Sequence, residues 1–138
     1  MRRALFVTTA LGLLLAGSTA SPVAADDPTA FTDSDTFIDT NPCSGLPDRI
    51  TVHFAGQVHQ HGDRFVAHIS RTGTTDSGYV MDHGVQHRQN NGQVETVQFN
   101  DRWRHADGSI FVVRGLAVFD PDTWEPQVDR FTSRCLRT

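Results

Sequence analysis

The fold is decided by residues 99–120, which read FNDRWRHADGSIFVVRGLAVFD. Aromatic and β-branched residues alternate with polar ones on both sides of Asp107-Gly108. Such alternation is typical of strands, and Asp-Gly is a strong signal for a tight hairpin turn. The stretch therefore predicts two long antiparallel strands joined by a two-residue turn.

The same alternation recurs on both sides of this hairpin, and no window has a helical period. Connections this short force neighbouring strands to run antiparallel. We expect an all-β protein, an antiparallel six-stranded meander closed as a small barrel; the alternative is a flattened two-sheet sandwich. The expected strands are 49–61, 64–75, 79–90, 93–105, 109–120 and 128–135, and residues 37–39 allow a short extra strand.

Residues 1–25 have the pattern of a signal peptide, with Arg2 and Arg3 before an apolar segment at 4–16. Cleavage is expected after Ala25, with Ala20 as the other candidate, and a retained anchor is the alternative. We expect a disordered leader at 26–36, a single β-barrel domain at 37–138, and a secreted, extracellular protein.

The whole chain has a formal net charge of −4 and contains no lysine. An acidic balance argues against nucleic acid as a partner and against stable membrane association. Two cysteines, Cys43 and Cys135, form an even pair, which in an exported chain predicts a disulfide bond.

Three stretches resemble a group of small exported proteins of actinobacteria. They are Asn41-Pro42-Cys43, residues 99–104 with Asp107-Gly108, and the end of the chain from Asp129-Arg130-Phe131 to Cys135. The resemblance covers most of the chain after residue 25. It implies secretion and an all-β fold, and it carries over no catalytic residue, because the group has no established activity.

Turn lengths fix strand register, and register decides which side chains share a face. Turns of two residues at 62–63, three at 76–78, three at 90–92 and two at 107–108 place a polar cluster on the apolar inner face, with Asp101 opposite Arg114. Converging polar groups between apolar walls are typical of a small-molecule site. The predicted ligand-binding residues are Arg71, Tyr79, His83, Asp101, Trp103 and Arg114, with His87 nearby; the alternative is a structural Asp101–Arg114 ion pair.

Other chemistry has weaker signals. His83 and Asp101 are candidates for acid–base catalysis. His59, His61 and His68 are candidate metal ligands, but a solvated polar face is the favoured explanation, so we expect no metal and no cofactor. His83 and His87 would lie too far apart along a strand to share an ion.

These observations favour a secreted protein that binds a small polar or anionic ligand inside the barrel. An extracellular protein-interaction module is the alternative, because strand 109–120 is apolar on both faces and would suit a protein partner there. A small enzyme of the isomerase or cyclase kind is a third hypothesis. The sequence has no motif for a nucleophilic serine or a phosphate loop, so it leaves enzyme activity undecided and favours its absence.

Overall fold

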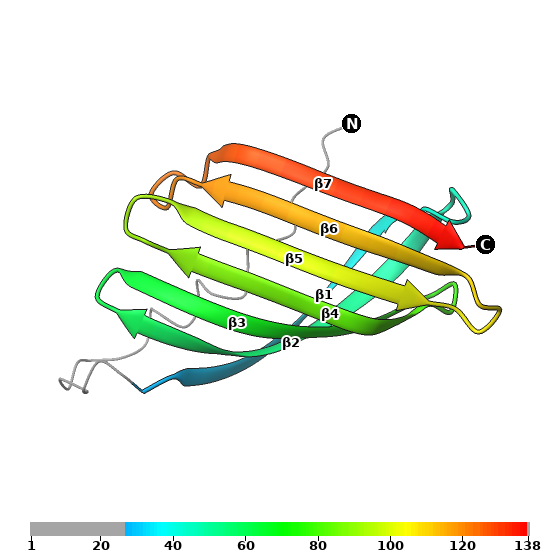
Figure 1. Ribbon diagram of the computed structural model, residues 1–138, viewed down its shortest axis with the longest axis horizontal. Coiled ribbons are helices and arrows are strands. Elements are labelled where there is room, and N and C mark those ends of the chain that lie inside the picture. Colours follow the sequence, from blue (N-terminus) through cyan, green and yellow to red (C-terminus); the bar gives the residue numbers. More distant parts are fainter. Residues whose placement is uncertain (1–26, 138) are drawn as a thin grey trace.

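The structure is a computed structural model that describes residues 27–137. This part of the chain is all-β and contains no helix, so it contains no helix that could cross a membrane (Figure 1). Its seven strands are β1 (Thr29–Thr40), β2 (Pro47–His61), β3 (Arg64–Thr75), β4 (Val80–Asn90), β5 (Glu95–Arg104), β6 (Ile110–Phe119) and β7 (Pro126–Arg137).

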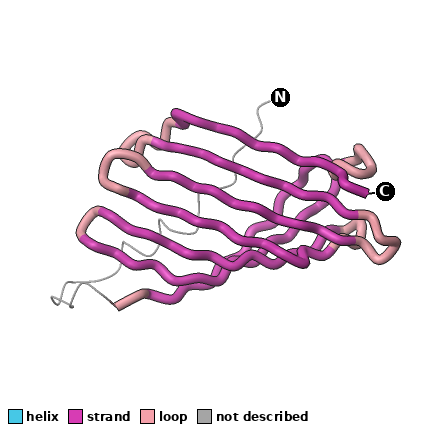
Figure 2. The backbone as a smooth tube through the Cα atoms, in the orientation of Figure 1, coloured by secondary structure: helices cyan, strands magenta, loops and turns pink. Residues whose placement is uncertain are grey.

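All seven strands form one antiparallel sheet in sequence order. Within residues 27–137, strands occupy most of the trace, and only short loops join them (Figure 2). The expected all-β meander is confirmed, but the six-stranded closed barrel is wrong, and so is the two-sheet sandwich. β1 and β7 each pair with one neighbour only, so the sheet has two open edges.

The seventh strand comes from the segment expected to be a disordered leader. Residues 29–36 form most of β1, which pairs with β2 from Thr29 to Thr40. Phe31 and Phe37 pack against the core clusters, and Asp33 and Asp35 lie between them on the same face of β1. Charged residues are common on edge strands because they discourage unwanted pairing, so the acidic composition did not indicate disorder here. The proposed signal peptide, residues 1–25, lies outside the described residues.

The sheet curls until its ends meet at the Cys43–Cys135 disulfide, which confirms the expected bridge. The β1–β2 loop carries Cys43 to the C-terminal end of β7 (Figure 1). This loop is fixed by buried Asn41 and Asp48, which hydrogen-bond each other and Ser77 of the β3–β4 turn. The bridge therefore holds a curled sheet whose first and last strands do not pair.

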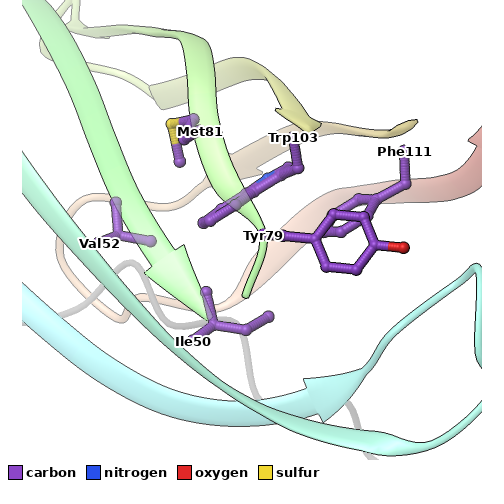
Figure 3. Packing of buried hydrophobic residues seen from close by; sticks show 6 residues of the cluster. All are labelled: Ile50, Val52, Tyr79, Met81, Trp103 and Phe111. Atoms are coloured by element: carbon purple, nitrogen blue, oxygen red, sulfur yellow. The ribbon is translucent and has the colours of Figure 1, made fainter. Parts of the chain in front are cut away.

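Near the disulfide, one hydrophobic cluster spans β2 to β6 and includes the aromatic residue Tyr79 of the β3–β4 turn. Trp103 stacks on Phe111 with ring centroids 5.6 Å apart, and the Tyr79 hydroxyl hydrogen-bonds the Ser109 hydroxyl. Figure 3 shows these rings beside each other, with the β2 side chains across from them. The cluster consists of Ile50, Val52, Tyr79, Met81, Trp103 and Phe111.

At the other end of the sheet, the buried apolar residues form two separate clusters. One joins β1 to β3 through Phe31, Val58, Ala67 and Ile69. The other joins β5 to β6 through Val97, Ala117 and Phe119. One cluster therefore connects β2 to β6 near the disulfide, whereas the two clusters at the other end do not contact each other. This separation agrees with an open sheet.

Two of the four turn lengths are as expected. His61 pairs with Arg64 around a two-residue turn, and Asp76-Ser77-Gly78 is a three-residue turn. The turn after Asn90 has four residues, because Asn90 pairs with Glu95. The turn at Asp107-Gly108 has three residues: His105 donates its backbone N–H to the Ser109 carbonyl and accepts from Gly108.

A β-bulge in β4 also changed the register. Asp82 and His83 together oppose Arg102, so every later residue of β4 is shifted to the other face. Val85 is consequently 46% exposed, although the turn lengths placed it in the core. The bulge error and the 91–94 turn error cancel in β5, whose Asp101 and Trp103 are buried as expected.

The error at Asp107-Gly108 is not cancelled, so β6 is inverted relative to the prediction. Phe111 and Phe119 face the core and are almost fully buried. Val112 and Leu116 face outward and are partly exposed. β6 is therefore apolar on both faces, as expected. The face that carries Phe111 and Phe119 is buried by other parts of the same chain.

Candidate functional site

Four of the six predicted ligand-binding residues lie on the inner face, and two do not. Arg71, Tyr79, Asp101 and Trp103 are on the core side of the sheet. Arg114 pairs with Asn100 and is exposed on the outer face, while Val113 takes the place opposite Asp101. His83 is also outward and exposed because of the β4 bulge.

The centre of the inner face holds an ion pair between Arg71 of β3 and Asp101 of β5. The Arg71 Nη2 to Asp101 Oδ2 distance is 2.9 Å, and only 10% and 3% of the two side chains are exposed. Arg71 also donates from Nη1 to the Oε1 atom of Gln86, on the intervening strand, at 2.6 Å. Three strands thus contribute to one buried polar cluster, which we call the inner polar cluster: Arg71, Gln86 and Asp101.

Two polar atoms of this cluster have no hydrogen-bond partner. They are the Nε donor of Arg71 and the Oδ1 acceptor of Asp101, and both are buried. A buried polar atom without a partner costs about 1–3 kcal/mol, more for a charged group. One donor and one acceptor therefore remain available beside the ion pair.

Glycines and phenylalanines make room for these charges on an apolar face. Gly84 lies opposite Asp101, and a methyl group there would overlap Arg71. The Arg71 guanidinium packs over the rings of Phe54 and Phe99, at 5.2 and 4.5 Å from their centroids. Such cation–π contacts partly replace lost hydration. The Phe99 ring in turn occupies the space above Gly115.

Burial dominates the electrostatics of the ion pair. Loss of hydration raises the pKa of Asp101 from 3.8 to about 6, although the charge and hydrogen bond of Arg71 act in the opposite direction. Burial likewise lowers the pKa of Arg71, against the effect of Asp101. The attraction within the pair does not fully offset the cost of removing both groups from water.

Tyr79 and Trp103 belong to the hydrophobic cluster near the disulfide. The Tyr79 ring lies 4.9 Å from that of Phe111 and 5.0 Å from that of His105. Their packing explains why both residues are buried, and no polar contact joins either of them to Arg71 or Asp101 in the described residues.

The strand histidines all lie on the outer face. His59, His61 and His68 are exposed, and His68 pairs across the sheet with His87, with 3.3 Å between their Nδ1 atoms. No group of three metal-ligating side chains occurs among residues 27–137. The candidate general base His83 lies on the opposite side of the sheet from Asp101, so these two residues do not form a catalytic pair.

A second buried ion pair joins Arg88 of β4 to Glu95 of β5, which the turn lengths did not predict. The side chains of both residues are less than 5% exposed, and the Arg88 guanidinium lies 5.8 Å from the ring centroids of Phe65 and Trp124. Trp124 has a positive φ of 59°, which is strained for a bulky residue. Because the bulge alone turns Arg88 inward, only detection of the bulge would have revealed this pair.

A surface hollow of about 400 Å³ lies at the far end of β2–β4, beside the two turns there, and includes His59, His61 and Phe65. It does not include any residue of the inner polar cluster. The inner polar cluster therefore lies outside this hollow, and the Arg71 side chain is 10% exposed.

The fold and the site define an all-β protein with a disulfide-linked, open antiparallel sheet and a charged cluster on its inner face. Comparison of the chain with protein-family models, with curated proteins and with solved structures found no match.

Proposed function

We propose that the protein is a secreted, non-enzymatic binding protein whose inner sheet face takes a small polar ligand at Arg71 and Asp101. The observation that carries the proposal is the pair of buried, unpartnered atoms, Arg71 Nε and Asp101 Oδ1. A ligand group that accepts one hydrogen bond and donates another would complete both.

The charges of the site favour a neutral ligand over an anion. The single positive charge of Arg71 is already balanced by Asp101 at 2.9 Å. A second anion beside Asp101 would be repelled by the Asp101 carboxylate, because water screens charges poorly in a buried site. Hydroxyl and carboxamide groups supply the required donor and acceptor without that penalty. Of the polar or anionic ligands expected from the sequence, we therefore propose a neutral polar ligand.

Binding is favoured over catalysis because no histidine among residues 27–137 lies beside Asp101. All six strand histidines are outward, and His105 lies in the β5–β6 turn. Secretion is supported by the signal-peptide pattern, the resemblance to exported proteins and the disulfide bond, which is typical of oxidising compartments.

A thermal-shift screen of neutral polyols, sugars and amides tests the proposal. The wild type is compared with Asp101→Asn and with a control variant, Asp129→Asn. The control removes an exposed carboxylate from a different strand, β7. We expect a ligand that raises the melting temperature of the wild type and of the Asp129→Asn variant but not of Asp101→Asn. If stability falls in Asp101→Asn and no compound distinguishes it from the wild type, the cluster is purely structural.

A protein-interaction module remains the second proposal, now on the basis of the open edges. In a seven-stranded meander β1 and β7 run in the same direction, so one added strand could pair antiparallel with either. Hydrogen exchange at several protein concentrations tests the simplest case, pairing between copies. We expect β1 or β7 amides to become protected as the concentration rises; exchange independent of concentration would exclude pairing between copies.

A further inference from the structure

The outer face of β5–β7 concentrates the arginines of the protein. Partners in the sheet register share a face, and outward positions on these three strands carry six of the ten arginines within residues 27–137. We call this surface the arginine face: Arg102, Arg104, Arg114, Arg130, Arg134 and Arg137. All six are exposed.

Carboxylates are segregated from this surface. No carboxylate occupies an outward position of β5–β7. Asp82, at the bulge of β4, is the acid that pairs with the arginine face, and it accepts hydrogen bonds from Arg102 and Arg104 at 2.8 and 3.0 Å. The arginine face therefore has five positive charges in excess. Residues 27–137 as a whole have ten arginines and fifteen carboxylates, a net charge of −5, so the acidic total conceals a cationic surface.

The arginines form an elongated band. Arg104 and Arg137 flank Ile110 in one row, and Arg102 and Arg134 flank Val112 in the next. Arg114 and then Arg130 continue in the following two rows. Three strands at about 4.8 Å give a width of about 10 Å, and three two-residue steps give a length of about 20 Å.

The other residues of the band indicate which anion it suits. No outward position of β5–β7 is aromatic, so the band offers no stacking surface for nucleic-acid bases or sugar rings. Val112, Leu116 and Val118 are only partly exposed between the arginines, so they are poorly placed to enter a bilayer. What remains is a row of guanidinium groups, whose planar fork matches phosphate oxygens.

We infer that the arginine face binds a linear phosphate polymer that lies along the strands and is recognised through its phosphates alone. Arg114, Arg130, Arg134 and Arg137 are the four arginines of this face without an ion-pair partner among residues 27–137, and they are free to contact the polymer. Each neutralised phosphate releases counterions, so affinity depends steeply on salt.

Titration of the full-length secreted protein with long-chain sodium polyphosphate tests this inference. For four contacts we expect the logarithm of the affinity to fall with the logarithm of the salt concentration with a slope of about −3. The double variant Arg114→Gln/Arg134→Gln should weaken binding about tenfold and reduce the slope by about 1.4. Arg49→Gln/Arg64→Gln is the matched control, because it removes the same charge from exposed positions on other strands.

The control and the alternative polymers decide the outcome. Equal losses in the two double variants would mean that only net charge matters and would overturn the inference. Tighter binding to oligothymidylate, heparin or phosphatidylglycerol vesicles than to polyphosphate would also overturn it, as would the absence of polyphosphate binding at about 50 mM salt. Matching melting temperatures of the variants and the wild type establish that folding is unchanged.

Discussion

Replacement of Asp101 by Asn tests whether burial or attraction to Arg71 controls the inner polar cluster. The side chain of Asp101 is 3% exposed and lies 2.9 Å from that of Arg71. The two influences act on its pKa in opposite directions, and the value of about 6 means that burial outweighs the attraction. The consequence appears in the pH dependence of the free energy of unfolding.

The sign follows from proton binding. Because the folded-state pKa of Asp101 is raised above the unfolded value, the folded protein binds more protons between about pH 4 and pH 6. Stability therefore falls as the pH rises through this window. A shift from 3.8 to about 6 corresponds to about 3 kcal/mol, at 1.36 kcal/mol per pKa unit.

Urea unfolding of the wild type and of Asp101→Asn at pH 4 and pH 7.5 measures this effect, because the other titrating groups largely cancel in the difference. We expect the stability advantage of the wild type over the variant to be about 2 kcal/mol smaller at pH 7.5 than at pH 4, because part of the effect of about 3 kcal/mol is already present at pH 4. An advantage that grows with pH would refute the reasoning, since Arg71 would then stabilise the carboxylate by more than burial destabilises it.

Three further predictions concern the frame around the cluster. Cys43→Ser/Cys135→Ser opens a loop spanning 92 residues and should lower the free energy of unfolding by up to about 4–5 kcal/mol, measured by urea unfolding against the oxidised wild type. Gly115→Val should cost about 1–3 kcal/mol, because the new side chain would overlap the Phe99 ring; Thr132→Val, at an exposed position on the neighbouring strand β7, should cost less than about 0.5 kcal/mol. Gly108→Ala forces a non-glycine residue to φ 92° and should cost about 1 kcal/mol in thermal unfolding, and an unchanged melting temperature would contradict the turn geometry.

Part of the site could be predicted because it depends on local signals. Arg71 lies between two correctly assigned turns, 62–63 and 76–78, and before the bulge, so its inward position follows from the register of β2 and β3. Asp101 was placed inward by two errors that cancel. Its partner was assigned as Arg114 because of the two-residue turn at 107–108, whereas the observed partner is Arg71, which also hydrogen-bonds Gln86.

The error at the central hairpin had a signal in the sequence. Asp76-Ser77-Gly78 and Ala106-Asp107-Gly108 both end in a glycine at positive φ, 95° and 92°. Each closes with the same backbone hydrogen bonds, the glycine N–H to the carbonyl three residues before it. A three-residue turn at 106–108 by analogy with 76–78 would have placed Phe111 in the core and Arg114 outside.

The sequence by itself determined six of the seven strands, their order, the antiparallel pairing and the disulfide bond, because each depends on residue alternation, short turns and cysteine count. Only the tertiary structure decided the β4 bulge, the recruitment of residues 29–36 into β1 and the open edges. A one-residue shift exchanges the two faces of a strand while leaving its pattern unchanged. For that reason the partner of Asp101 and the outward arginines of β5–β7 are properties of the folded sheet, which the sequence pattern leaves undecided.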